Sequence, residues 1–404
     1  MAVSEKRRAE LTLCLSVFIS LVGIGIVVPL FPVFVTELGA SAVWIGAVFT
    51  AFALSRTIFM PLFGRLSDSF EKKNIIAAGA FLYAIISLGY VIADDVVLLT
   101  TVRFVHGIAS AMIAPVAMAY LGEIAGIGRE GRTMARYQAS ILFGFGAGPF
   151  IGGAIYVLYG YDAAFYTLAA ISAIAFLVLV AFLPGTKQVQ AEDKGSGASE
   201  KKKKNLLSAA RVLAGTPLYL GVFLLTMALE FGMVGIIVFL PLYAGSVGLT
   251  PFSSGLLISV NFFASATLQM TFGWIADRFR RTRLVIAGAA VIGLSFILVT
   301  SCTGLTQLLI ILVINAFGFF MVMPAINAYM VGAGRITGMG KAMGIYNFVR
   351  GAGGIISPVI GGMVVDSFGI APLFSLTGAL IIFSGAGFVI LARISGKNEK
   401  NPGV

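Results

Sequence analysis

Apolar segments of about 20 residues recur along this 404-residue chain and are separated by short polar stretches. An α-helix needs roughly 20 apolar residues to cross the hydrocarbon core of a bilayer. Segments of this length are centred near Ile24, Ala53, Ala84, Ala111, Phe145, Ala173, Glu230, Phe262, Ile292, Phe317, Ile356 and Ile381. The sequence therefore predicts an all-α integral membrane protein with twelve transmembrane helices.

Lys and Arg are distributed unequally between the loops on the two sides of the predicted membrane. With the N-terminus placed in the cytoplasm, 26 of the 28 Lys and Arg fall in tails and loops on one side, and Arg56 and Arg103 lie inside spans. Because cytoplasmic loops carry an excess of Lys and Arg, both termini and the central loop are predicted to be cytoplasmic. We expect a multi-pass protein of the cell membrane.

Composition agrees with lipid as the solvent. Hydrophobic residues make up 59% of the chain and charged residues 11%, and the mean hydropathy is +1.00. The net charge of +11 reflects membrane topology, so no nucleic-acid partner is expected. The two cysteines, the single histidine and the lack of a phosphate-binding loop predict no metal, cofactor or enzymatic activity.

The chain contains an internal repeat with an offset of 209 residues. This register aligns Pro32 with Pro241, Asp68 with Asp277, Tyr137 with Tyr346 and Pro149 with Pro358, along with several glycines. Each copy has six predicted spans, so both copies cross the membrane in the same direction and form a parallel repeat. Two similar bundles around a central seam are suited to alternating access.

Domain boundaries follow from the polar linker between the copies. It contains glycine, serine and the lysine run at 201–204. We predict an N-terminal six-helix bundle at 1–184, a cytoplasmic linker at 185–212 and a C-terminal six-helix bundle with a short tail at 213–404.

Two loops carry the same motif, one in each copy. The segment 64–73 contains Gly64, Arg65 and Asp68, and the segment 273–281 contains Gly273 and Asp277. A glycine fits a helix end, and an acid can cap a helix or pair with a cation, forming a latch that breaks and re-forms. The loops resemble the signature of the major facilitator superfamily, which implies the major facilitator fold over essentially the whole chain.

Two further segments narrow the resemblance. The fifth span contains Gly148, Pro149, Gly152 and Gly153, which resemble the family's antiporter motif. The segment 25–32 is similar to a motif of twelve-helix drug:proton antiporters. Each of these residues also has an ordinary explanation in helix packing and helix geometry, so the functional expectation rests on the set.

The fourth span contains Arg103 and His106, in a segment that resembles another family motif whose arginine is implicated in proton transfer. The family pattern favours glutamine at the position of His106. Alternatively, Arg103 reaches toward the outer interface, and His106 is a buried, neutral, hydrogen-bonded residue.

Glu230 is an acid in the middle of the seventh span. A charge there costs on the order of 2.5–3.5 kcal/mol, so it should face the bundle interior and have a partner or a proton. We expect it to couple proton flow to a substrate. Arg56 is one possible partner, unless it extends to the cytoplasmic interface, and Glu123 is expected to pair with loop cations.

Few polar residues lie on the spans expected to line a cavity. The candidates are Arg56, Tyr120, Glu230, Asn261, Asn315, Asn327, Tyr329, Tyr346 and Asn347. Met and Phe dominate the rest, which suits hydrophobic or varied substrates but would equally serve as core.

These features predict a monomeric transporter, embedded in the lipid bilayer, that exports hydrophobic or amphipathic small molecules in exchange for protons. An alternative is a proton symporter or exchanger for an organic anion, sugar or other metabolite, because Arg56 and Arg103 would welcome a carboxylate. A third alternative is a membrane sensor or scaffold that transports nothing.

Overall fold

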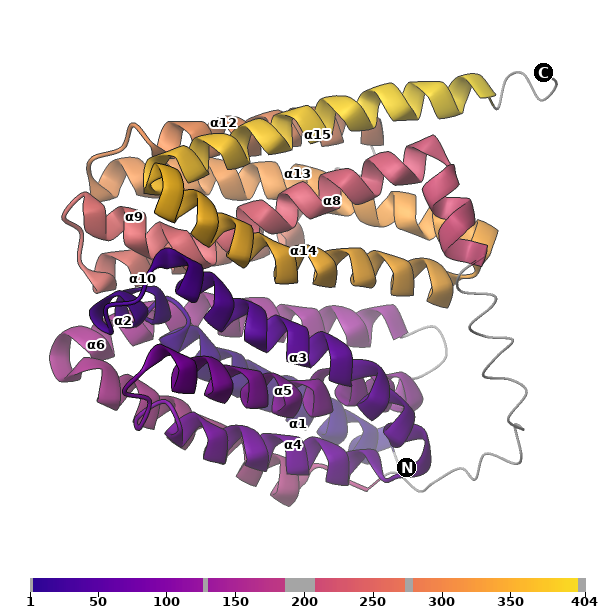
Figure 1. Ribbon diagram of the computed structural model, residues 1–404. Coiled ribbons are helices and arrows are strands. Elements are labelled where there is room, and N and C mark those ends of the chain that lie inside the picture. The colour runs from indigo at the N-terminus through magenta and orange to yellow at the C-terminus, as the bar shows by residue number, and fades with distance from the viewer. Residues whose placement is uncertain (1–2, 126–129, 186–207, 273–278, 399–404) are drawn as a thin grey trace. The chain divides into compact units, whose positions relative to one another are not determined.

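Figure 1 shows the computed structural model, which describes residues 3–125, 130–185, 208–272 and 279–398. The described chain is helical and contains no strand. Its helices are α1 Val3–Val27, α2 Phe31–Glu37, α3 Ala42–Ser69, α4 Lys72–Leu88, α5 Val96–Ile124, α6 Glu130–Phe182, α8 Pro217–Val234, the π-turn η1 Gly235–Phe239, α9 Leu240–Ser246, α10 Pro251–Phe272, α12 Arg281–Val299, α13 Leu305–Thr337, α14 Met339–Phe368 and α15 Ile370–Asn398. The predicted all-helical membrane fold is confirmed.

Within the described residues, ten helical segments are long and apolar enough to cross a membrane. Helix α6 contains two of the twelve predicted spans, because its backbone breaks at Gly160, where φ is 79°. The third predicted span is α4, which has 17 residues. Every predicted apolar segment is therefore centred in a described helix.

The first span of each copy is interrupted near its end. After α1 the chain turns at 28–30, and α2 begins with Pro32 in its first turn. In the second copy, η1 follows α8, and α9 begins with Pro241 in its first turn. Proline lacks an N–H and fixes φ, so it fits a first helical turn but not a helix interior.

The repeat is visible in the backbone. Gly39 and Gly248, 209 residues apart, have φ of 75° and 78°. Gly160 and Gly369, again 209 residues apart, have φ of 79° and 88°. Because this region of φ favours glycine, the two copies turn at matching positions for the same physical reason.

The structure divides into two compact units. Of the described residues, one unit contains 3–185, 236–266 and 358–370, and the other contains 208–235, 267–357 with its gap, and 371–398. This division follows contacts and not the repeat, so the bundles 1–184 and 213–404 remain a prediction. In the first unit, α1 packs on α6 and α3 on α5, as Figure 1 shows.

One end of the first unit lacks basic residues. Its turns at 38–41, 89–95 and 247–250 and its breaks at Gly160 and Gly369 contain no Lys or Arg. Asp94 and Asp95 lie in these turns, and Asp95 caps α5 by accepting hydrogen bonds from Val97 N and Leu98 N. We call this the acidic end.

Candidate functional site

An ion pair joins Glu230 on α8 to Arg350 on α14. Arg350 Nε donates to Glu230 Oε1 at 2.6 Å. The Glu230 side chain is 12% exposed and that of Arg350 is 42% exposed. A carboxylate inside a span needs a partner, and this arginine supplies one while part of its side chain remains exposed.

Local structure brings these two helices together. A methyl group added to Gly353 would lie 2.9 Å from Glu230 Cβ, so this glycine allows α14 to approach α8 closely. Tyr346, which is buried, lies one turn before Arg350 on α14. The π-turn η1 begins at Gly235, and such turns often interrupt helices at functional sites. The pair thus lies where the helix geometry is irregular.

Arg350 was assigned by the sequence to the loop cations, and the structure corrects this. It lies 11 residues after Met339, the first residue of α14, which is about 16 Å along a helix. In the 209-residue register its counterpart is Ile141. Glu230 likewise aligns with an apolar residue, Leu21. The alignment of a charged residue with an apolar counterpart is the signal in the sequence that could have identified Arg350 as well as Glu230.

Arg103 lies in a cage of aromatic rings. It is 2% exposed, and its guanidinium carbon lies 4.5 Å from the centre of the Phe52 ring. The rings of Phe31 and Phe49 lie 4.7 Å and 5.3 Å away. Among the described residues no carboxylate forms an ion pair with it, and its Nε and Nη1 have no hydrogen-bond partner. Cation–π attraction to these rings contributes to stabilising the enclosed charge.

His106 lies one turn after Arg103 on α5 and is fully buried. Its Nδ1 shares a hydrogen bond of 2.5 Å with the Tyr90 hydroxyl, and its ring centre lies 3.7 Å from that of Tyr83. Its Nε2 is buried and has no hydrogen-bond partner among the residues that the structure describes. The geometry matches the alternative in which His106 is a buried, hydrogen-bonded residue.

Arg56 and Glu123 lie in the first unit. Arg56 is half-buried on α3, whereas the partner that the structure gives Glu230 is Arg350. Glu123, at the end of α5, forms an ion pair with Lys72 Nζ at 2.7 Å. This is the type of contact with a loop cation that the sequence predicts.

The predicted latch segment differs from the expectation. Gly64 does not end its helix, because α3 continues to Ser69 and the Phe70 N–H closes its last turn on Leu66 O. Arg65 is exposed, and no described residue bonds the exposed Asp68 carboxylate. The second copy of the motif, Gly273 and Asp277, lies outside the described residues.

The antiporter-like motif forms a close helix crossing. A methyl group on Gly148 would lie 2.5 Å from Gly25 Cα, and one on Gly152 would overlap Ile26 O, so α6 touches the α1 backbone here. A methyl group on Gly153 would lie 2.8 Å from Phe252 Cα on α10. The motif therefore packs α6 against two helices at once.

Pro149 and Gly255 form the first of two related seams at the acidic end. A methyl group on Gly255 of α10 would overlap Pro149 O. The Phe150 N–H, next to the proline, donates to Ser259 Oγ at 2.9 Å. We call this the α6–α10 seam.

Pro358 and Gly46 form the matching α3–α14 seam. A methyl group on Gly46 would overlap Pro358 O, and one on Gly362 would overlap Ala42 O. Asp366 near the end of α14 accepts hydrogen bonds from Ala42 N at 2.8 Å and Val43 N at 3.0 Å. The sequence did not single out Asp366, because its partners are 324 and 323 residues away.

Several predicted cavity residues are packed in the interior. Tyr120 is fully buried and donates to Pro184 O at 2.7 Å, so its hydroxyl is unavailable to a solute in this conformation. Asn315 is buried and donates to Ser295 Oγ at 2.8 Å, and Asn261 is also buried. These three residues are packed inside the helix bundles in this conformation, and their place in a substrate cavity stays a prediction.

The other cavity candidates lie in the second unit. The hydroxyl of Tyr329, which is half-buried, shares a hydrogen bond of 2.9 Å with Thr282 Oγ1. Asn327 and Asn347 are exposed, and Asn347 lies one turn before Arg350. An exposed amide side chain, that of Asn347, therefore lies on α14 one turn from Arg350.

Comparison with known proteins gives a consistent result. The family model described as "Major Facilitator Superfamily" matches residues 13–332 and 218–403. An uncharacterized MFS-type transporter of Methanocaldococcus jannaschii is 28% identical over 92% of this chain and 95% of its own. Multidrug resistance protein 1 of Bacillus subtilis is 27% identical over 94% and 95%. Quinolone resistance protein NorA of Staphylococcus aureus is 26% identical over 91% and 94%.

Solved structures share the fold. A bacterial homolog of the human lysosomal transporter Spinster, in an inward-facing and unoccupied conformation, matches with a TM-score of 0.83 at 14% identity, covering 98% of this chain and 99% of its own. The human organic anion transporter MFSD10 matches with a TM-score of 0.66 at 16% identity, covering 95% and 99%. At these identities the likeness speaks for the fold alone.

Proposed function

Because this chain belongs to the major facilitator superfamily, we propose that it is a proton-coupled exporter of hydrophobic or amphipathic small molecules. The fold and family are those of a membrane transporter, not of an enzyme. The observation that carries the proton-coupling proposal is the Glu230–Arg350 pair at 2.6 Å. The names of the relatives from Bacillus subtilis and Staphylococcus aureus support the class of substrate.

Protonation of Glu230 supplies the coupling step in this proposal. A proton on Oε1 or Oε2 removes the negative charge, so Arg350 loses its anionic partner and the hydrogen bond between the two side chains weakens. The guanidinium becomes free to turn toward its exposed side, and α8 and α14 lose the ion pair between them. A ligand can shift a conformational equilibrium only by interacting differently with the two states, and this proton does so.

Transport then proceeds by alternating access of the bundles 1–184 and 213–404. In this proposal the basic tails and linker face the cytoplasm, and the acidic end of the first unit faces outward. The two seams at that end form the contact that closes the outer side. The protein acts as a monomer in the cell membrane.

Two arginines weigh against an anionic substrate. Arg103 is enclosed by aromatic rings and is 2% exposed, and Arg350 is neutralised by Glu230. Neither offers an unpaired, accessible cation to a carboxylate. The exposed part of Arg350 and the neighbouring Asn347 nevertheless favour one alternative, an organic anion that displaces Glu230 from the pair.

The test uses purified protein in proteoliposomes with an imposed proton gradient and a fluorescent lipophilic cation. We expect Glu230→Gln to reduce proton-driven transport at least about tenfold while substrate exchange without a gradient continues. The control is Asp94→Asn, which removes an exposed acid at the acidic end. Unchanged gradient-driven transport by Glu230→Gln would refute the assignment.

Competition distinguishes the two substrate classes. Small carboxylates and lipophilic cations are added separately to the same assay. The efflux proposal predicts inhibition by the cations and little effect of the carboxylates. A clear preference for carboxylates that is lost in Arg350→Gln would establish the anion alternative instead.

A further inference from the structure

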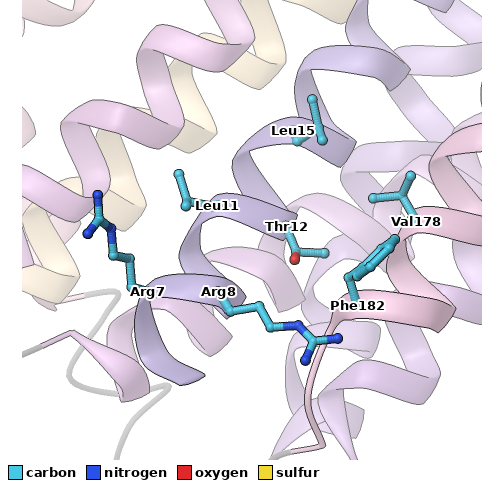
Figure 2. A pocket seen from close by; sticks show the side chains of 7 residues that line it. All are labelled: Arg7, Arg8, Leu11, Thr12, Leu15, Val178 and Phe182. Carbon is cyan, nitrogen blue, oxygen red and sulfur yellow. The ribbon is translucent and has the colours of Figure 1, made fainter. Parts of the chain in front are cut away.

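A groove opens between the start of α1 and the end of α6, remote from the Glu230–Arg350 pair in sequence. Its volume is about 750 Å³, and it is lined by Arg7, Arg8, Leu11, Thr12, Leu15, Val178 and Phe182. Figure 2 shows the arginines at the start of α1 and the apolar side chains above them. We propose that this groove binds one anionic phospholipid, with its phosphate at the arginines and an acyl chain along the leucines and Phe182.

Depth is the first argument for a phospholipid. The helical residues 11–27 of α1 contain no charged side chain, and 17 helical residues extend about 26 Å, most of the roughly 30 Å thickness of the hydrocarbon core. Arg7 and Arg8 therefore lie in the headgroup layer, whereas Leu11 and Leu15 lie at the level of the acyl chains. Phe182, on the other wall, ends a stretch at 164–182 that is likewise uncharged.

Charge is the second argument. Figure 2 shows the guanidinium of Arg8 beside Phe182, with its Cζ 5.5 Å from the ring centre. Within the described part of the chain, Arg8 makes one long hydrogen bond, from Nη2 to Ala181 O at 3.5 Å. A guanidinium has five N–H donors, so donors remain for a phosphate. Glu10 on the same helix forms an ion pair with Arg136, with 2.9 Å between Glu10 Oε1 and Arg136 Nη1, and not with Arg7 or Arg8.

The apolar wall is the third argument. Leu11 is 58% exposed, Leu15 49% and Phe182 52%. These side chains form an apolar surface that begins next to Arg7 and Arg8 and extends along the groove. A free phosphate would use the arginines but leave this surface uncovered. A phospholipid covers both parts, and an anionic headgroup matches the charge better than a zwitterionic one.

The test measures lipid retention by native mass spectrometry of the purified full-length protein, given equal amounts of phosphatidylglycerol and phosphatidylcholine. We expect one retained lipid, with a preference of about tenfold for phosphatidylglycerol. The double variant Arg7→Gln/Arg8→Gln should abolish that preference. The matched control, Arg211→Gln/Arg393→Gln, removes two exposed arginines outside the groove and should keep it.

A second variant separates a seated lipid from diffuse attraction. Val178→Trp keeps both arginines but fills the groove, so it should lower retention of the lipid without changing net charge. The proposal is overturned if Val178→Trp retains lipid like the wild type, or if both double arginine variants lose the preference equally. It is also overturned if the wild type retains no phospholipid, as expected when another segment or a second copy covers the groove. Thermal unfolding in detergent checks that each variant is folded.

Discussion

The two seams at the acidic end share a geometry and differ in chemistry. In the α3–α14 seam, Gly46 lies against Pro358 O, and in the α6–α10 seam, Gly255 lies against Pro149 O. Both the glycines and the prolines are 209 residues apart. The repeat therefore determines how closely the helices approach, because only a glycine can lie against a backbone carbonyl at this distance.

The polar contacts of the seams are unrelated. In one seam the Asp366 carboxylate accepts two backbone N–H bonds at the start of α3, and Ser41 at the N-cap position makes no side-chain capping bond. In the other, Ser259 accepts a single N–H from Phe150. The counterpart of Asp366 is Val157. One seam is thus held by a charged group at a helix N-terminus and the other by a neutral hydroxyl.

The two copies of the repeat therefore keep the same packing while each has its own polar contact. Packing decides whether the seams can close at all, and the polar contacts decide how strongly each is held. Substitutions in the glycines should therefore affect both seams alike, whereas substitutions in Asp366 and Ser259 should separate them.

The largest effect is expected from Gly46→Ala and Gly255→Ala. Each added methyl group would overlap a backbone carbonyl, and overpacking costs typically 1–3 kcal/mol. We expect each variant to lower proton-driven transport in proteoliposomes by about tenfold, and by similar factors because the geometry is shared. Gly245→Ala is the control, since open space surrounds that glycine. Loss in only one variant would contradict the shared geometry.

Asp366→Ala should have the next largest effect. Asp366 accepts from the first N–H groups of α3 as a capping side chain would, and removing such a side chain costs about 0.5–2 kcal/mol, which corresponds to a roughly 2- to 30-fold shift toward a separated seam. The measurement is the rate at which a thiol reagent labels Ala42→Cys in a background with Cys14 and Cys302 replaced by serine. We expect at least about fivefold faster labelling.

Two further variants define the cause. Asp366→Asn keeps an acceptor oxygen and should give an intermediate rate, because the charge is lost but one hydrogen bond remains. Asp162→Asn removes an exposed acid that the structure does not place in either seam and should leave the rate unchanged. Equal labelling of Asp366→Ala and the wild type would show that this cap does not hold the seam.

Much of the fold was predictable because the bilayer dictates it. Uncharged stretches of helical length, the glycines at 39 and 248, and the 209-residue register each carry local physical information. Gly64 was predicted to lie at a helix end but lies inside α3, because glycine is compatible with both positions. Only the tertiary environment, which allows α3 to continue to Ser69, decides between them.

The candidate site was less predictable because its partners are distant in sequence. Glu230 was evident as a charge inside a span, but its partner Arg350 lies 120 residues away and looked like a loop cation. Asp366 lies 324 residues from Ala42. A sequence shows that a buried or terminal charge needs a partner but not which helix provides it.

Ser259→Ala should have a smaller effect than Asp366→Ala. It removes one neutral hydrogen bond, which contributes about 0.5–1.5 kcal/mol, and leaves Phe150 N–H without that acceptor. In the same cysteine-free background, Ser254→Cys reports on the α6–α10 seam, one residue before Gly255. We expect labelling to be about twofold to fivefold faster. A larger increase in labelling than that caused by Asp366→Ala would show that the polar contact of the α6–α10 seam is the stronger of the two.

The smallest effect is expected from Val157→Asp, which introduces into the first copy the acid that Asp366 provides in the second. Val157→Asp places a carboxylate at the position that matches Asp366, near the start of α10. The counterparts of Ala42 and Val43 there are Pro251 and Phe252, and proline has no N–H to donate. The new acid can therefore receive only one of the two amide bonds. We expect Ser254→Cys to be labelled about twofold more slowly in this variant. Adding Pro251→Ala restores the second donor and should slow labelling further, whereas no change with either substitution would mean that the seams differ in more than this one side chain.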